Sequence, residues 1–202
     1  MNQYESDYKK LRLHPNKILL TLLLMGITML FLAMSASYIY QRVTEGIGAI
    51  QLPYTFLINA LVLMGSSYTL HQAKKAYLND DTEDYKRQLT YTLGLTLLFM
   101  TAQVYAWADM SAQGLMPNTG PAVGYIYALA ILHFVHVFAG IPFFVLFLKT
   151  AYQRMKEPVS VLIYFSDPEK RLKLRLLEVY WHYLDVLWLF LVVFFTVNYL
   201  IS

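Results

Sequence analysis

The chain has 202 residues, of which 57% are hydrophobic and only 14% are charged, whereas soluble domains carry roughly 25% charged residues. It contains no cysteine, which excludes disulfides, thiolate metal ligands and cysteine nucleophiles. The formal net charge of +3 is too small to indicate nucleic-acid binding. Together with long apolar runs, this composition predicts an integral membrane protein.

Five segments are long and apolar enough for a helix to cross a bilayer, which takes about 20 residues. They are continuous and rich in Leu, Met and Phe, unlike the shorter, alternating spans of a β-barrel. We therefore expect one all-α domain over residues 1–202, built as a bundle of five transmembrane helices. The expected spans are residues 18–40, 54–76, 89–107, 125–148 and 181–200.

The loops between these spans differ in charge. Of the 16 Lys and Arg residues, all but Arg42 lie before the first span or in the second and fourth loops. The positive-inside rule then predicts a cytoplasmic N-terminus and an outside C-terminus. Ala33-Met34-Ser35-Ala36 offers a cleaved signal peptide as an alternative. We do not expect cleavage, because the apolar stretch is too long and the leader is acidic at Glu5 and Asp7.

Small side chains in the first two spans predict where helices approach one another closely. They are Gly26, Ala33 and Ser37 in the first span, and Gly65 with Ser66 in the second.

Polar side chains also lie within the spans. Asn59 and Ser66 share a face of the second span, and Gln103 lies in the third. Buried amides and hydroxyls need partners, so we expect these groups to form hydrogen bonds between helices.

Two helix starts can be located outside the spans. Asp81 is expected to cap the third helix, with further acids in the first turn. In the long loop at residues 149–180, residues 159–165 are expected to form a short strand or a segment at the membrane interface. After them, Asp167 and Pro168 are typical of an N-cap and a first helical residue. The last helix should therefore begin outside the membrane and continue into it.

Three histidines fall within spans. His133 and His136 share a face of the fourth span, and His182 lies in the fifth, so a haem or metal site is one interpretation. We expect packing histidines instead, because His133 lies in the outer half of its span and His182 near the inner end of its own, a large separation for one coordination sphere. The chain is accordingly expected to contain no catalytic, cofactor-binding or metal-ligating residue.

The last span carries a polar stripe. Glu178, His182 and Asp185 share one helix face, and Arg171 and Arg175 extend this stripe toward the aqueous side. An ionisable residue at the bilayer centre costs at least ~2.5 kcal/mol, so such residues face protein or water. The stripe therefore needs another helix or another protein to pack against. No ionisable group follows Asp185, so we do not expect a proton path through this chain alone.

The sequence of the last span, Trp181-His182-Tyr183-Leu184-Asp185-Val186-Leu187-Trp188-Leu189-Phe190, resembles the signature of the last helix of subunit III of haem-copper respiratory oxidases. That family includes cytochrome c oxidases and their quinol-oxidase relatives. The run from His133 to Gly140 is similar to the paired-histidine helix of the same family. The resemblance covers about residues 15–200 and fits the five-helix bacterial form. Weaker collinear matches are Leu52-Pro53, Asn59, Ser66, Ser67, Gln103 and Trp107, and Glu178 stands where the family often has a glutamate.

Two positions depart from the family pattern. The family carries membrane glutamates where this chain has Thr28 and Ala106. Any role of those acids in proton transfer or in carbodiimide reactivity cannot be transferred to this chain.

The resemblance implies a non-redox accessory subunit III of a haem-copper terminal oxidase, located as a multi-pass protein in the bacterial cytoplasmic (inner) membrane. Such a subunit packs against catalytic subunit I, holds phospholipid and supports proton uptake during oxygen reduction, while haem and copper belong to partner subunits. Lys149 and Arg154 are suitably placed for lipid phosphates.

Alternatives stay open at this point. One is an accessory subunit of a quinol oxidase or a nitric oxide reductase, since nothing in the sequence selects an electron donor. Another is an independent membrane metal or haem protein that uses His133, His136 and His182. A small transporter is a third, although no repeat symmetry supports it.

Overall fold

The computed structural model of the chain is helical, and it describes residues 14–155, 161 and 166–201. No strand occurs in that part of the chain, and the expected all-α class is confirmed. Residues 159–165, expected as a strand or an interfacial segment, lie outside the described residues except for Val161. The helices are α2 (Pro15–Glu45), α3 (Tyr54–Leu78), α4 (Thr82–Ala112), α5 (Pro121–Arg154) and α7 (Pro168–Leu200).

Most of these helices can cross a membrane. By length and hydropathy, α2, α4, α5 and α7 qualify within the described residues, so a helical membrane bundle is confirmed. The 25 residues of α3 span about 37 Å at 1.5 Å per residue, which exceeds the hydrocarbon thickness of about 30 Å. Polar residues such as His71 and Lys74 lower its hydropathy. That α3 forms a fifth span stays a prediction.

Both expected caps are present. The Asp81 side chain accepts a hydrogen bond from the backbone N–H of Asp84 at 3.0 Å, and Asp167 accepts one from that of Glu169 at 2.9 Å. From Pro168, α7 continues without a break to Leu200, as the sequence predicts.

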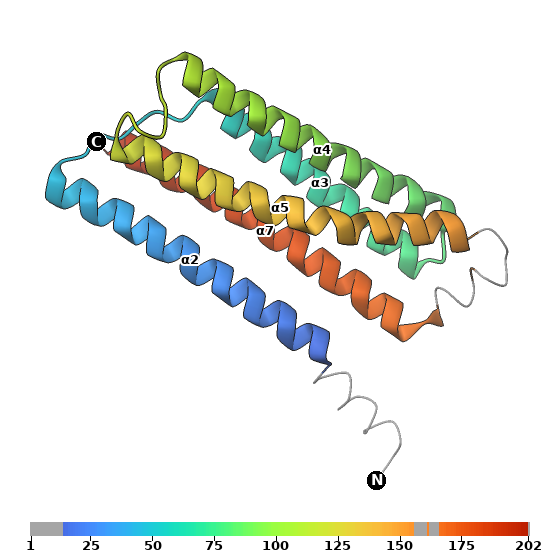
Figure 1. Cartoon of the computed structure of the whole chain (residues 1–202). Helices are drawn as coiled ribbons and strands as arrows, with labels where there is room; N and C mark the ends of the chain where they lie inside the picture. Colours follow the sequence, from blue (N-terminus) through green and yellow to red (C-terminus); the bar gives the residue numbers. More distant parts are fainter. Residues whose placement is uncertain (1–13, 156–160, 162–165, 202) are drawn as a thin grey trace, which may run out of the picture.

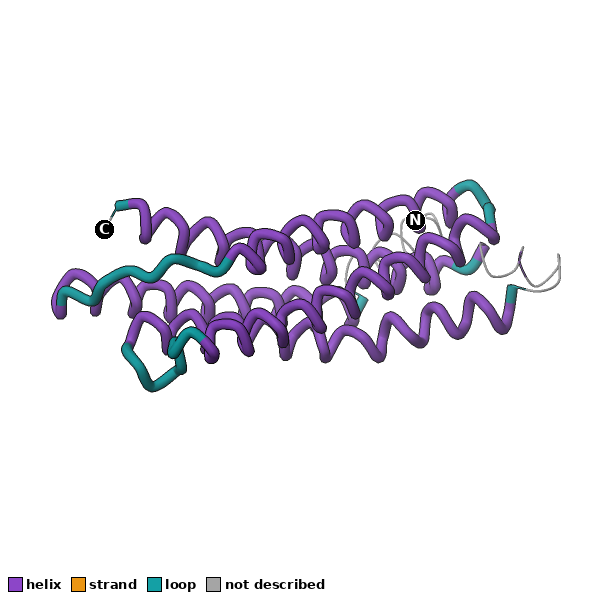
Figure 2. Tube along the Cα trace, turned by 90° about the horizontal axis from the view of Figure 1, so that it is seen from above, coloured by secondary structure: helices purple, strands orange, loops and turns teal. Residues whose placement is uncertain are grey.

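The helices lie side by side along the long axis of the molecule (Figures 1 and 2). Helices α3 and α4 form an antiparallel hairpin, and α7 packs against both α3 and α5. Helix α2 lies beside α5 and α7, on the side away from the hairpin (Figure 1).

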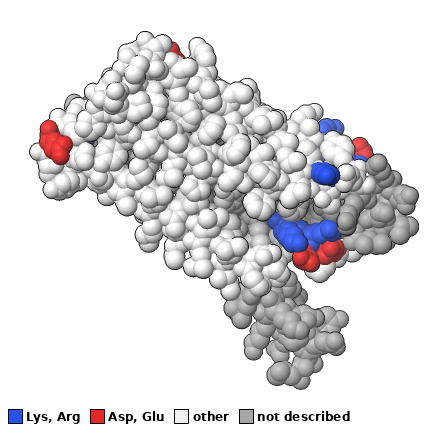
Figure 3. All heavy atoms as spheres, viewed as in Figure 1, with Lys and Arg blue, Asp and Glu red and all other residues white. Residues whose placement is uncertain are grey.

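Charged residues gather at the two ends of the bundle and leave its middle without charge on the visible face (Figure 3). We call one end the basic end: there α2, α4 and α7 begin and α3 and α5 terminate. Arg42 lies at the opposite end, where its Nη1 donates to the side-chain oxygen of Asn198 at 2.7 Å.

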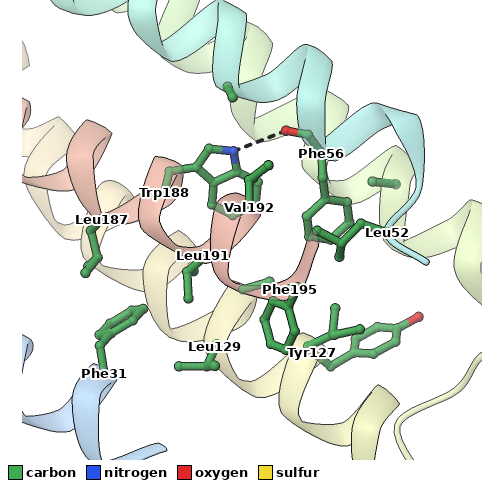
Figure 4. Packing of buried hydrophobic residues seen from close by; sticks show 14 of the residues in the cluster. Phe31, Leu52, Phe56, Tyr127, Leu129, Leu187, Trp188, Leu191, Val192 and Phe195 are labelled. Atoms are coloured by element: carbon green, nitrogen blue, oxygen red, sulfur yellow. Dashed lines mark hydrogen bonds between the residues drawn. The ribbon is translucent and has the colours of Figure 1, made fainter. Parts of the chain in front are cut away.

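Trp188 is the centre of the apolar core. Its ring is fully buried, stacks on Phe56 with centroids 5.4 Å apart and meets the edge of Phe99 at 5.2 Å. Its indole N–H donates to the backbone oxygen of Phe56 at 3.3 Å (Figure 4). One side chain of α7 thereby joins α3 and α4, and its polar atom has a partner.

The packing face of α2 differs from the expectation. Gly26 and Ala33 are exposed, and a Cβ on Gly26 would meet no atom within 4 Å. Ser37 does reach α5, where its hydroxyl lies 2.6 Å from that of Tyr125. The face is instead built by larger side chains, because Tyr38 can reach across to the edges of three rings on α5 and α7. The buried residues of α2 are Ile27, Phe31, Ser35 and Tyr38.

The close approach of α5 to α7 depends on a glycine. A Cβ on Gly140 would lie 2.9 Å from both Tyr180 Cε1 and Trp181 Cζ3, closer than side-chain carbons can approach. At Gly65 of α3 the corresponding distance to Leu95 of α4 is 3.6 Å, an ordinary contact. Close approach of the two helices is therefore required at Gly140 and only permitted at Gly65.

We expect Gly140→Val to force α5 and α7 apart and to destabilise the protein by about 1–3 kcal/mol, as overpacking does in other cores. The measurement is the thermal unfolding midpoint in mild detergent. Gly94→Val is the matched control, since a Cβ at Gly94 meets nothing within 4 Å. Equal midpoints for the two variants would contradict this assignment.

Candidate functional site: a polar ladder between α3 and α7

The polar stripe of α7 packs against a matching stripe on α3. In each helix the polar residues recur at spacings of four and three, and the two helices run in opposite directions (Figure 1). The polar residues of the two helices therefore face one another in sequence, from those near the basic end to those deeper in the bundle. We call these six residues the polar ladder: Ser67, His71 and Lys74 of α3, with Glu178, His182 and Asp185 of α7.

Glu178 forms the outermost ion pair of the ladder. Its side chain is only 7% exposed, and its Oε2 lies 2.7 Å from the Nζ of Lys74. Its Oε1 lies 3.7 Å from His71 and 3.8 Å from His182. Burial of an unpaired carboxylate is very unfavourable, so Lys74 is what makes this position of Glu178 tolerable.

Ser67 connects the deeper two residues of the α7 stripe. Its hydroxyl is hydrogen-bonded to Nδ1 of His182, and the Asp185 carboxyl group faces the same hydroxyl. Asp185 is 5% exposed, and its Oδ2 has no hydrogen-bond partner in the structure. The ladder thus ends in a buried carboxyl group with one free oxygen.

The ladder can hold its protons in two arrangements. In one, His182 donates from Nδ1 to Ser67, which leaves the hydroxyl proton of Ser67 available to the neighbouring Asp185 carboxyl group. In the other, Ser67 donates to Nδ1, so the imidazole proton sits on Nε2 and faces Glu178. A hydroxyl donates only one hydrogen bond, so movement of one proton on His182 changes the environment of both carboxyl groups.

The sequence predicted the α7 half of the ladder and its need for a partner, but it did not identify that partner. The missed residues are Ser67, His71 and Lys74, which show the same spacing of four and three on α3. That spacing is the feature of the sequence from which the polar stripe on α3 could have been predicted. The side chain of His71, near the end of α3, is 64% exposed.

His133 lies closer to the α7 stripe than we expected. Its Nε2 donates to the backbone oxygen of Leu184 at 3.0 Å, and Leu184 directly precedes Asp185. The expected large separation from the polar residues of α7 is therefore wrong. The expectation judged depth from the start of the apolar run at residue 181, whereas Asp185 lies near the middle of the whole 33-residue helix α7.

The three membrane histidines have separate partners. His136 Nδ1 contacts the backbone oxygen of Leu132 at 2.7 Å, His133 contacts Leu184, and His182 contacts Ser67. The backbone oxygen of His136 also accepts from Tyr180 Oη at 2.8 Å. Within the described residues, no group of three or more His, Asp or Glu side chains is placed to hold a metal ion.

The expected hydrogen bonds between α3 and α4 are confirmed. Asn59 Nδ2 donates to Gln103 Oε1 at 2.8 Å, and both side chains are fully buried. Two turns further along the same pair of helices, the Ser66 and Thr96 hydroxyls lie 3.4 Å apart. These contacts hold the hairpin together in a region where water cannot satisfy amides.

The two departures from the resembling family have structural roles. The Thr28 hydroxyl lies 2.9 Å from that of Tyr183 and so joins α2 to α7. Ala106 is fully buried in the core.

The cations expected to contact lipid lie near the end of α5. Lys149 is exposed. Arg154 is the last residue of the helix, and its side chain lies outside what the structure describes. Their binding to lipid phosphates stays a prediction.

Known proteins resemble this chain over most of its length. The family model described as cytochrome c oxidase subunit III matches residues 20–199. Cytochrome c oxidase subunit 3 of Thermostichus vulcanus is 28% identical over 145 residues, which cover 72% of this chain and 65% of that protein. The subunit 3 of Synechocystis sp. is 25% identical over 66% of this chain and 52% of its own length.

A probable quinol oxidase subunit 3 of Staphylococcus aureus is 28% identical over 175 residues, which cover 87% of this chain and 79% of that protein. The chain thus spans between half and two thirds of the length of the two cytochrome c oxidase subunits, and a larger share of the length of the quinol oxidase subunit.

We predict that Lys74→Met destabilises the protein by about 1–3 kcal/mol, because it leaves Glu178 buried beside two histidines without its ammonium partner. Thermal unfolding in detergent measures the effect. Lys75→Met is the control, since Lys75 lies one position further and is exposed. Adding Glu178→Gln to Lys74→Met should recover most of the loss. A double variant no more stable than the single one would contradict the pairing.

Proposed function

This chain belongs to the cytochrome c oxidase subunit III family, and we propose that it is a non-redox accessory subunit of a haem-copper terminal oxidase in the bacterial cytoplasmic membrane. It packs against the catalytic subunit I, stabilises it and supports proton uptake during oxygen reduction. The haem and copper of the reaction belong to the partner subunits.

The observation that carries the proposal is that the family match from residue 20 to residue 199 includes the whole polar ladder. A non-redox role is supported by the membrane histidines, each of which is held by its own helix contacts. His133 and His136 bond to backbone oxygens, and His182 bonds to Ser67. These rings serve packing and proton placement.

Support for proton uptake comes from the position of the ladder. It opens at the basic end, where His71 is 64% exposed and the Lys74 side chain 35% exposed. It leads from there to the buried Asp185 near the middle of α7. With the basic end in the cytoplasm, as the positive-inside rule predicts, the ladder would exchange protons with the side from which an oxidase takes them.

The electron donor has two candidates within the family. The two cytochrome c oxidase subunits named above favour cytochrome c. The match to a probable quinol oxidase subunit 3 covers a larger share of both chains, and that observation favours quinol. The donor binds other subunits of such a complex, so either is compatible with the same accessory role.

The test is to isolate the chain from its native membranes in mild detergent, identify its partners by mass spectrometry and record a reduced-minus-oxidised visible spectrum. The proposal predicts co-purifying oxidase subunits, with haem absent from this chain after separation. Partners from a nitric oxide reductase would assign the chain to that complex instead. A chain recovered alone with its own haem or metal would overturn the proposal and make His133, His136 and His182 the site.

For Asp185→Ala we expect a several-fold lower recovery of the intact complex and, because the ladder is proposed to support proton uptake, slower oxygen consumption by each complex that assembles. The change removes a buried carboxyl group one turn beyond the contact between Ser67 and His182, so it loosens α7 against α3. Complex yield and oxygen consumption per haem measure the two effects separately. Asp109→Ala, at the opposite end of the bundle, is the control. Unchanged yield and detergent stability in Asp185→Ala would count against the structural role of the ladder.

A further inference from the structure

Asp185 is a buried carboxyl group beside which the described residues place no counter-ion. It is 5% exposed, and its Oδ2 has no hydrogen-bond partner in that part of the chain. Glu178 is buried to a similar degree, but the Nζ of Lys74 lies 2.7 Å from its Oε2. Asp185 follows Glu178 by seven residues, about 10 Å along the helix axis. The ammonium group that neutralises Glu178 is therefore not a partner of Asp185.

The helices packed against α7 supply no positive charge at the depth of Asp185. Helices α2 and α4 carry charged residues only near their ends, and His71 of α3 faces Glu178. In α5, His133 donates from Nε2 to the backbone oxygen of Leu184. Its Nδ1 has no partner among the described residues, so a second proton there would be a buried donor without an acceptor. The His133 ring is therefore neutral.

A buried carboxylate without a counter-ion is very unfavourable, and such a group takes up a proton instead. By this argument the two carboxyl groups of the ladder differ in charge. Glu178 is a carboxylate because Lys74 is paired with it, whereas Asp185 is a neutral acid.

The hydrogen bonds of the ladder lead to the same assignment. Nε2 of His182 faces the Glu178 carboxylate at 3.8 Å, which favours a proton on Nε2 and leaves Nδ1 as an acceptor. The Ser67 hydroxyl, bonded to this Nδ1, then donates to His182. Because a hydroxyl has only one proton to donate, Ser67 can only accept from the neighbouring Asp185. The carboxyl group can donate only if it carries a proton.

We propose that Asp185 is a proton-binding site, which holds one exchangeable proton as a neutral carboxylic acid and donates it to the Ser67 hydroxyl. Donation then runs in the same direction along the whole ladder, toward Glu178. Only the carbonyl oxygen of the acid is left without a partner, and an unpaired neutral carbonyl costs less than an unpaired charge.

The same hydrogen bonds can move this proton toward the basic end. The O–H bond of Asp185 breaks as the Ser67 oxygen accepts its proton, while the Ser67 hydroxyl proton passes to Nδ1 of His182. The products are a carboxylate at Asp185 and an imidazolium at His182, so the total charge is unchanged. The imidazolium faces the Glu178 carboxylate, and the reverse step returns the proton. Its use in proton uptake rests on the proposed function, whereas the protonation of Asp185 does not.

Infrared spectroscopy tests the protonation, because the C=O stretching band of a carboxylic acid is well separated from the bands of a carboxylate. The unmodified protein, purified in detergent, is compared with Asp185→Asn from about pH 5 to pH 8, the range in which histidines titrate. Asp109→Asn is the matched control. Asp109 lies at the opposite end of the bundle, where its Oδ2 accepts from Gln113 Nε2 at 3.0 Å.

We expect Asp185→Asn to lose one acid band at every pH in this range, including its upper end, where an ordinary aspartate with a pKa of about 3.9 is ionised. Asp109→Asn should lose carboxylate bands only. Loss of carboxylate bands alone in Asp185→Asn would overturn the proposal.

A second variant, Ser67→Ala, keeps the carboxyl group and removes the acceptor of its proton. The acid band should then persist at a shifted frequency, because the acid loses its hydrogen bond. In deuterated buffer the band of the unmodified protein should also shift, since the proton is exchangeable. An unshifted band in Ser67→Ala would overturn the donation from Asp185 to Ser67.

The direction of the chain is measured at His182 by nitrogen NMR of protein labelled at histidine, with His182→Gln used to assign the signals. We expect the proton on Nε2 and an unprotonated Nδ1. A proton on Nδ1 alone would contradict the direction of donation.

None of these spectra requires an oxidase partner. Their failure leaves the subunit partners untouched, because those are measured by co-purification. Failure of the co-purification test leaves the acid band of Asp185 measurable in the isolated chain.

Discussion

The structure depends on the pairing of α3 with α7 through the polar ladder. A carboxylate such as Glu178 is tolerated in a membrane helix only where another group of the protein neutralises it, and Lys74 does so at 2.7 Å. Because the next contact, between Ser67 and His182, lies deeper in the same pair of helices, the register of α3 against α7 is fixed at two points. A shift of one turn would break both.

Helix α7 is the element on which the other helices converge. It holds α3 through the ladder, and it contacts α5 where Gly140 allows Trp181 to approach. It meets α2 through the hydroxyls of Tyr183 and Thr28. This arrangement supports the proposed accessory role, because polar groups that a redox centre would recruit are engaged in joining helices.

Much of the fold could be predicted from the sequence, because apolar length and helix caps are local properties. The caps at Asp81 and Asp167 are examples. Contacts between helices were predicted less well, since they depend on register and on side-chain reach. Gly26 on α2 was expected to pack but is exposed, because the large ring of Tyr38 builds that interface. His133 was placed too far from α7, because the depth of residues in α7 was judged from the apolar run at 181–200 and not from the whole helix.

The most direct test of the ladder is a cross-linking measurement in native membranes. Because the chain contains no cysteine, the introduced thiols are the only ones that can form a disulfide within it. Ser67→Cys combined with His182→Cys should form an intramolecular disulfide rapidly under mild oxidation. Ser67→Cys with Val193→Cys, displaced by about 16 Å along α7, should not. Efficient cross-linking of the displaced pair, or none in the first pair, would contradict the register of α3 against α7.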